Sequence, residues 1–153
     1  MIKINKIGGL KMKKHVSYSD LTFDERTEWL EDNLGKGMYV RTDNGIDRFN
    51  YKLKRENQDF YWYCFEKKEL TNPGSYVEKE PSYDIINLIE VGDYVNGLEV
   101  MSISYFKDGR RYIEFDDGKY LCKNYQIESI VTKAQFESIK YEVKNDQINF
   151  KYF

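Results

Sequence analysis

The stretch Leu88–Val100, LIEVGDYVNGLEV, indicates how the second half of the chain folds. Its apolar residues flank a Gly-Asp pair and Asn96-Gly97, a dipeptide that strongly favours a tight hairpin turn. Asp93 could perform chemistry, or it could only accept backbone N–H groups where a strand begins. Catalysis would need a partner, and the nearby acids Glu90 and Glu99 show no motif spacing. We therefore interpret Asp93 as a turn residue and the stretch as the entry into a small β-barrel.

Turn signals recur through the second half at intervals near ten residues. Asp108-Gly109 and Asp117-Gly118 follow Asn96-Gly97, and short strand-like runs lie between them. Closely spaced short strands are typical of an antiparallel barrel or curled sheet. The side chains expected to be mostly core are Ile89, Val91, Val95, Val100, Ile103, Ile113 and Phe115. A short helix should follow, with Thr132 as its N-cap and Gln135 reaching back.

The first half combines a helix, a hairpin and an aromatic strand. Thr22 and Glu25 make a capping-box pattern, which predicts a helix over residues 23–34. Asn44-Gly45 predicts a hairpin turn, and the run DFYWYCFEKK at 59–68 predicts a strand covered on both faces. The fold class expected is α+β and β-rich. We divide the chain into a flexible arm at 1–16, a helix with hairpin and aromatic strand at 17–80, and a small barrel with a short helix and a terminal hairpin about Asn145-Asp146 at 81–153.

The beginning of the chain allows two interpretations. The run IGGLKM at 7–12 can be encoded by codons that contain a ribosome-binding site placed suitably before the codon of Met12. Met12 would then be the natural start, and residues 1–11 would not belong to the natural product. The alternative is that Gly8-Gly9 is part of an ordinary flexible arm.

Composition limits the classes of function. The net charge of −2 gives no global field for nucleic acid or membrane, so such binding would need a local patch. Two cysteines without a CxxC motif argue against a disulfide scaffold or a zinc site. No apolar run approaches the length of a membrane span or of a signal peptide. We expect a protein of the bacterial cytoplasm, with no membrane association and no cofactor.

The sequence favours a protein that is not an enzyme. The single histidine, His15, lies in a Lys-rich arm, so neither Cys64 nor Cys122 has a histidine beside it in sequence. Asp116-Asp117-Gly118 lacks the spaced oxygen ligands of a calcium loop and is interpreted as a hairpin turn. No glycine-rich loop suited to phosphate is present. We predict no catalytic residue and no metal site.

The predicted helix offers the first candidate surface. We place Phe23, Leu30 and Leu34 on its buried side and Trp29 nearer its acidic side. An exposed Trp within a polar ring is a common anchor at protein interfaces. The predicted protein-binding residues are Trp29, Asp24, Glu25, Glu28, Glu31 and Asp32. The alternatives are a solvated acidic face and a Trp that packs against a neighbouring segment.

Basic residues near aromatic ones offer the second candidate surface. Such a mixture suits single-stranded nucleic acid or a nucleotide, because bases stack on rings while phosphates pair with cations. The residues predicted for this alternative are Arg41, Arg48, Lys52, Lys54, Arg55, Tyr61, Arg110 and Arg111. The competing interpretation is a core strand beside a solvated hairpin.

Three stretches carry a family resemblance: YVRTDNG at 39–45, SYDIINLIEVGDYVNGLEVMSI at 82–103 and IESIVTKAQFESIKYEV at 127–143. From about Met38 to Val143 the chain resembles small uncharacterised phage and prophage proteins of low-G+C Gram-positive bacteria. The segments before and after this range are not typical of them. VGDYVNG also distantly resembles the first-strand entry of SH3-like small barrels. The resemblance implies a mobile-element origin and a β-rich fold, and it supplies no catalytic residues.

The function expected is therefore that of a phage or prophage accessory protein that binds a host or phage protein. An inhibitor of a host defence system, of the anti-CRISPR kind, is the form that we expect. The alternative is a protein that binds or sequesters nucleic acid or a nucleotide. The sequence sets neither the partner nor the oligomeric state.

Overall fold

The computed structural model describes residues 17–139 of the chain. Within them, the polypeptide divides into two compact units. Unit 1 comprises residues 17–42 and 47–83, and unit 2 comprises residues 43–46 and 84–139. The predicted arm at 1–16 and the hairpin about Asn145-Asp146 lie outside the described residues.

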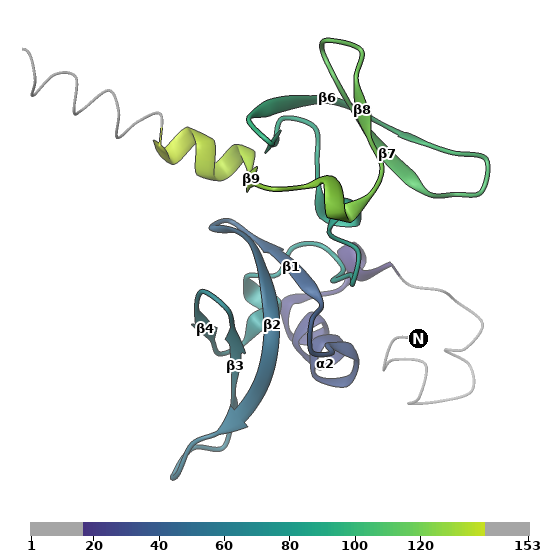
Figure 1. Ribbon diagram of the computed structural model, residues 1–153. Helices are drawn as coiled ribbons and strands as arrows, with labels where there is room; N and C mark the ends of the chain where they lie inside the picture. The colour runs from purple at the N-terminus through teal and green to yellow at the C-terminus, as the bar shows by residue number, and fades with distance from the viewer. Residues whose placement is uncertain (1–16, 140–153) are drawn as a thin grey trace, which may run out of the picture. The chain divides into compact units, whose positions relative to one another are not determined.

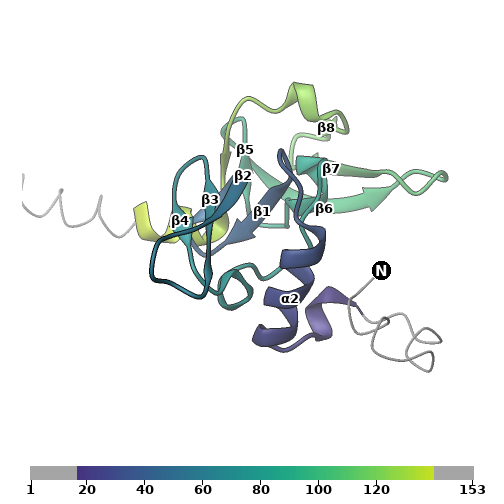
Figure 2. The ribbon, with the colours of Figure 1, turned by 90° about the horizontal axis from the view of Figure 1, so that it is seen from below.

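Unit 1 packs one helix against a four-stranded antiparallel sheet (Figures 1 and 2). The helix α2 (Phe23–Asn33) begins with the predicted capping box between Thr22 and Glu25. The strands follow the order of the sequence, β1 (Tyr39–Thr42), β2 (Gly45–Lys54), β3 (Tyr61–Phe65) and β4 (Glu69–Leu70). The remaining elements are the 3-10 helices η2 (Tyr18–Asp20) and η3 (Pro73–Ser75).

The core of unit 1 confirms part of the predicted buried stripe. Leu30 is fully buried between the helix and the sheet, and Leu34 is partly buried against the same cluster. The prediction for Phe23 is wrong, since this side chain is 59% exposed. The predicted hairpin between β1 and β2 is confirmed. Its turn is formed by Asp43 and Asn44, and Gly45 opens β2 with a φ of +112°.

Unit 2 contains a five-stranded antiparallel sheet in the order β8-β7-β6-β5-β9. Its strands are β5 (Tyr94–Val95), β6 (Leu98–Tyr105), β7 (Arg111–Phe115), β8 (Tyr120–Leu121) and β9 (Ile130–Val131). The 3-10 helix η4 (Ile85–Leu88) precedes the sheet, η5 (Asn124–Gln126) precedes β9, and a helix over residues 133–139 follows it.

The turns of unit 2 lie where the sequence predicts them. Asn96 and Gly97 both have positive φ between β5 and β6, as a two-residue hairpin with an Asn-Gly turn requires. Gly109 and Gly118 also have positive φ, in the turns before β7 and β8. The last helix begins with the predicted capping pair, because Thr132 N donates to Gln135 Oε1 and Gln135 N donates to Thr132 Oγ1.

The core of unit 2 is largely the predicted one. Ile89, Val95, Val100 and Ile113 have no exposed area, Phe115 is buried, and Ile103 packs against them. The prediction for Val91 is wrong, since this side chain is 49% exposed. The α+β, β-rich class is confirmed, while the likeness of this sheet to an SH3-like barrel stays a prediction.

Candidate functional site

Trp29 is a core residue of unit 1, which corrects the predicted protein-binding anchor. Its side chain is 6% exposed, and its ring meets the Tyr18 ring edge-on at 5.2 Å between centroids. The Tyr18 hydroxyl in turn donates to the Val77 carbonyl at 2.8 Å. The 3-10 helix η2 and the segment at Val77 therefore cover the side of α2 that the helical wheel assigns to solvent.

The acidic side chains of α2 remain at the surface without that anchor. Asp24, Glu28, Glu31 and Asp32 are exposed. Glu25 is half-buried and serves the helix itself, because Thr22 N donates to its Oε1 at 2.9 Å. The predicted acidic face exists, but it surrounds no exposed aromatic residue of α2 other than Phe23.

Two of the arginines predicted for nucleic acid have structural positions instead. Arg41 is only 5% exposed because β1 is covered on both of its faces, and Val40 beside it is fully buried. Arg111 donates from Nη1 to the Ile86 carbonyl at 2.8 Å and from Nη2 to the Ile89 carbonyl at 2.9 Å. These two side chains are not the free surface cations that the sequence interpretation required.

Lys52 and Arg48, two other predicted cations of unit 1, lie near aromatic rings. The Lys52 ammonium lies 4.8 Å from the centre of the Tyr61 ring, and Arg48 lies 5.4 Å from that of Tyr39. Lys54 is exposed and stands opposite Tyr61 in the register of β2 and β3. Lys52, Lys54 and Tyr61 thus come together, as the sequence interpretation expected.

A second aromatic group lies on the other face of the same two strands. The register places Tyr51 opposite Cys64 and Leu53 opposite Trp62, so these side chains share one face. The Phe60 ring lies 6.1 Å from the Trp62 ring. We call Tyr51, Leu53, Arg55, Phe60 and Trp62 the ribbon face.

Arg55 completes the ribbon face by covering the indole of Trp62. Its guanidinium lies 4.4 Å from the centre of the Trp62 ring and 3.0 Å from the Glu69 carboxylate. The hydrogen bond from Arg55 lowers the pKa of Glu69. Trp62 Nε1 donates to Gln58 Oε1 at 2.7 Å, which restrains the position of the indole.

Sequence reasoning missed the exposure of the ribbon face. The aromatic strand was expected to be covered on both faces, yet Phe60 within it is 46% exposed, and Tyr51, which lies on the same face of the neighbouring β2, is 56% exposed. Only the end of β3 fits the expectation, since Tyr63, Cys64 and Phe65 are buried. Tyr63 and Phe65 belong to the core cluster that contains Leu30 of α2, so strand alternation turns Phe60 and Trp62 to the face of β3 that points away from α2. The aromatic run contains no signal for which of its two faces the helix covers.

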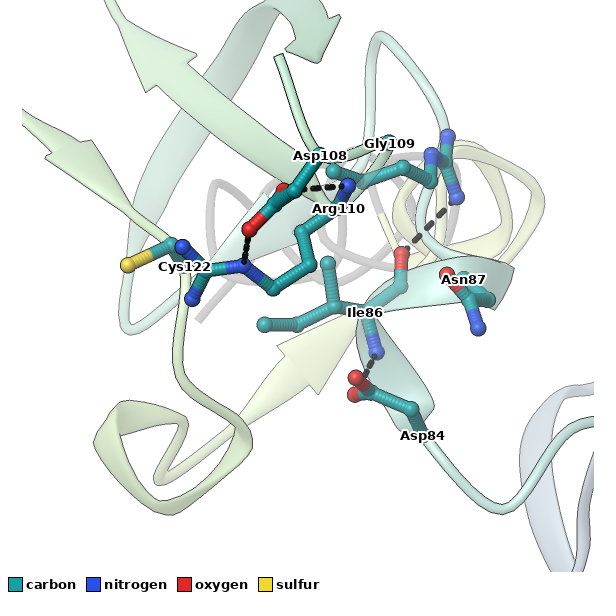
Figure 3. A pocket seen from close by; sticks show the side chains of 8 residues that line it. Asp84, Ile86, Asn87, Asp108, Gly109, Arg110 and Cys122 are labelled. Atoms are coloured by element: carbon teal, nitrogen blue, oxygen red, sulfur yellow. Dashed lines mark hydrogen bonds and ion pairs between the residues drawn. The ribbon is translucent and has the colours of Figure 1, made fainter. Parts of the chain in front are cut away.

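Unit 2 contains a pocket of about 340 Å³ between η4, the turn before β7 and Cys122. Arg110 crosses it in Figure 3, and its Nε donates to Asp108 Oδ2 at 2.7 Å. Asp84 accepts from Ile86 N at 3.1 Å, so this carboxylate is engaged in the turn that it caps. The charged groups of the pocket thus make hydrogen bonds within the folded chain.

Cys64, the other free cysteine of the described residues, is a buried thiol. Burial raises the pKa of the Cys64 thiol, whose Sγ donates to Glu69 Oε2 at 3.5 Å, and a protonated thiol is a poor nucleophile. No group of three or more His, Cys, Asp or Glu side chains within residues 17–139 is arranged to hold a metal ion.

Asp93 is a structural residue, as the sequence predicts. It is fully buried, and its Oδ2 accepts from Glu90 N at 2.8 Å. Its Oδ1 accepts from Lys133 N at 2.9 Å, a contact that sequence reasoning did not foresee. The carboxylate therefore joins the start of β5 to the first turn of the last helix.

No protein-family model, curated protein or solved structure matches the chain. The resemblance to phage and prophage proteins stays a prediction. Among the helices of the described part of the chain, none combines the length and apolar character needed to cross a membrane.

Proposed function

We propose that the protein is a non-enzymatic binding protein and that the ribbon face is its contact surface. The observation that carries the proposal is the cluster of Tyr51, Phe60 and Trp62 at the surface, with Arg55 stacked on the indole. Tyr, Trp and Arg dominate the binding energy of protein interfaces. Exposed aromatic rings that lie together rather than singly mark an interaction site.

The charges around the ribbon face favour a protein partner over a polyanion. Lys52, Lys54 and Arg55 are offset by Glu56 and Asp59 within the same ribbon. Arg55 is also neutralised by Glu69. A phosphate backbone requires a net positive surface, whereas the centre of a protein interface is poor in unpaired charge.

The biological setting that we propose follows from the family resemblance of residues 38–143. It is that of a phage or prophage accessory protein that inhibits a host defence system by protein–protein contact. Replacing the predicted surface around Trp29 with the ribbon face does not affect this setting. The proposed contact is made by other residues, but it is still a contact with a protein.

A double variant tests the contact surface. Tyr51→Ser with Phe60→Ser should remove two exposed rings while the core of unit 1 stays intact. Affinity for the partner should fall about tenfold or more, since loss of one hot-spot ring typically exceeds 1 kcal/mol. The partner is first captured from nuclease-treated bacterial lysate, identified by mass spectrometry, purified and titrated by calorimetry.

Tyr76→Ser is the matched control. Tyr76 belongs to the same unit and is 52% exposed, but it caps η3 and lies outside the ribbon face. Its loss should leave the affinity unchanged. Equal affinity of the double variant and the wild type would show that the ribbon face is not the contact surface.

Binding of single-stranded nucleic acid or a nucleotide is the second candidate function. Its support is the approach of Lys52 to the Tyr61 ring, with Lys54 beside them and Arg48 further along β2. Such binding should weaken steeply as salt rises, and Arg48→Glu with Lys54→Glu should abolish it. Lys119→Glu, which reverses an exposed charge in unit 2, is the control. No affinity for single strands, duplexes or cyclic nucleotides at low salt would end this candidate.

A further inference from the structure

The pocket of about 340 Å³ in unit 2 has two arginines in its wall, Arg110 and Arg111. Both follow the turn at Asp108-Gly109, and Arg111 is the first residue of β7. The volume lies at the small end of the range of about 300–1,000 Å³ that is usual for ligand sites. The pocket can therefore hold a small molecule or one side chain of a partner.

Arg110 is held from two sides, although its side chain is 57% exposed. Its Nε donates to Asp108 Oδ2 at 2.7 Å, and its backbone N–H donates to Asp108 Oδ1 at 3.1 Å. The guanidinium carbon lies 5.0 Å from the centre of the Phe106 ring. These contacts restrain the orientation in which Arg110 crosses the pocket (Figure 3).

The two terminal nitrogens of Arg110 remain available to a ligand. Neither Nη1 nor Nη2 makes a hydrogen bond to any residue from 17 to 139. A guanidinium presents its donors in a planar fork, which a planar carboxylate matches with two parallel hydrogen bonds. Because Asp108 occupies only the Nε of this guanidinium, the end formed by Nη1 and Nη2 can bind a second carboxylate.

Arg111 adds a second positive charge to the wall of the pocket. Its Nη1 and Nη2 donate to the carbonyls of Ile86 and Ile89, which are neutral acceptors. Its Nε is buried and has no hydrogen-bond partner within the described chain. No carboxylate of residues 17–139 forms an ion pair with Arg111, so its charge is not neutralised by a direct contact there.

The acids of the pocket limit which anion fits. Asp108 is paired with Arg110, and Asp84 accepts from Ile86 N at the start of η4. The formal charges of the two arginines and the two aspartates in the wall cancel. A doubly charged phosphate would therefore meet more repulsion from Asp84 and Asp108 than a singly charged carboxylate would.

We propose that this pocket binds a carboxylate group and that the terminal nitrogens of Arg110 are its main donors. Charge-assisted bidentate hydrogen bonds supply the affinity, and the charge of Arg111 favours an anion over a neutral amide. A Glu or Asp side chain of a partner protein is the source of the carboxylate, which rests on the proposed function. Binding of the carboxylate group itself does not depend on that function.

The test uses the full chain and the peptide acetyl-Gly-Glu-Gly-amide, whose only charge is one carboxylate. In NMR titrations this peptide should shift the Nε–H signal of Arg110 and the backbone amide signal of Cys122. The peptide acetyl-Gly-Gln-Gly-amide should shift neither signal.

Arg110→Lys keeps the charge but loses the fork. Its affinity for the Glu peptide, followed at Cys122, should fall about tenfold, which corresponds to the loss of one charge-assisted hydrogen bond. Lys107→Gln is the matched control, because Lys107 is an exposed cation of the same turn that does not line the pocket. Its loss should leave the affinity nearly unchanged.

Asp84→Asn should strengthen binding of the Glu peptide. Its amide oxygen can still accept from Ile86 N, while one negative charge leaves the wall of the pocket. Weaker binding in this variant would contradict the electrostatic argument. Equal shifts with the Gln peptide, or equal losses of affinity in Lys107→Gln and Arg110→Lys, would overturn the site itself.

Sodium acetate and inorganic phosphate are the remaining probes. Saturation by phosphate at a lower concentration than by the Glu peptide would overturn the choice of a carboxylate. Saturation by acetate without any response to the Glu peptide would confirm the carboxylate site and overturn a protein as its source. These outcomes are distinct from failure of the ribbon face, which is tested with other variants in unit 1.

Discussion

Asp93 Oδ1 accepts a hydrogen bond from the backbone N–H of Lys133 at 2.9 Å, across forty positions of the sequence. The other carboxylate oxygen accepts from Glu90 N, in the turn before β5. A single buried side chain thereby fastens the entry of the sheet to the start of the last helix.

Replacement of Asp93 should lower the free energy of unfolding. Asp93→Asn retains an acceptor for only one of the two N–H groups and turns an NH₂ group toward the other. A buried donor without an acceptor costs about 1–3 kcal/mol, so the free energy of unfolding should fall by about that amount, and by more in Asp93→Ala. Urea unfolding measures the loss. Asp117→Asn is the control, because this exposed turn residue needs one oxygen for Lys119 N and should change stability little.

Trp29→Ala should unfold the protein more easily rather than remove a partner. The ring is buried against Tyr18, and truncation of a buried aromatic typically costs about 3–5 kcal/mol. Phe23→Ala on the same helix should stay within about 0.5 kcal/mol of the wild type, because Phe23 is exposed. Thermal unfolding of both variants decides between a core role and a surface role for Trp29.

The contribution of the Arg55–Glu69 ion pair to stability should be lost at low pH. Arg55 lowers the folded-state pKa of Glu69. The contribution of the pair to stability is therefore present above the ordinary range of a Glu carboxyl, about 4.3, and disappears as the pH falls through the lowered value. Arg55→Gln should raise the pKa of Glu69, as measured by NMR titration of the side-chain carboxyl.

Asp108 is the internal reference for that titration. Its pKa is also lowered, chiefly by the hydrogen bond from Arg110 N. This contact lies in unit 2 and does not involve Arg55. The pKa of Asp108 should therefore be the same in the wild type and in Arg55→Gln. A Glu69 titration that Arg55→Gln leaves unchanged would contradict the role assigned to the ion pair.

Truncation of Phe115 should destabilise the protein far more than truncation of Val91. Phe115→Ala should cost about 3–5 kcal/mol, since the ring is buried within the cluster around Ile113. Val91→Ala should cost less than about 0.5 kcal/mol, because the side chain is half exposed. Denaturant midpoints of the two variants provide the comparison, and equal losses would contradict the core described here.

Local chemistry allowed much of the fold to be predicted from the sequence. A capping box needs only Thr22 and Glu25, or Thr132 and Gln135, at a spacing of three, and both helices begin there. Asn96-Gly97 accepts the positive φ that a two-residue turn requires, whatever surrounds it. Strand alternation is also a local property, because successive side chains of a strand point to opposite faces. It predicted that Ile103, Ile113 and Phe115 point toward the core.

Tertiary packing decided what covers each face, and with it the candidate surfaces. Trp29 is buried by Tyr18 and the segment at Val77, which the periodicity of α2 cannot reveal. Phe60 and Trp62 belong to the same aromatic run as Tyr63 and Phe65, yet only the latter pair lies in the core beneath α2. Burial depends on neighbours distant in the sequence, whereas caps and turns depend on adjacent residues. The sequence by itself therefore determined where helices and turns begin, and only the folded chain decided which aromatic rings remain exposed.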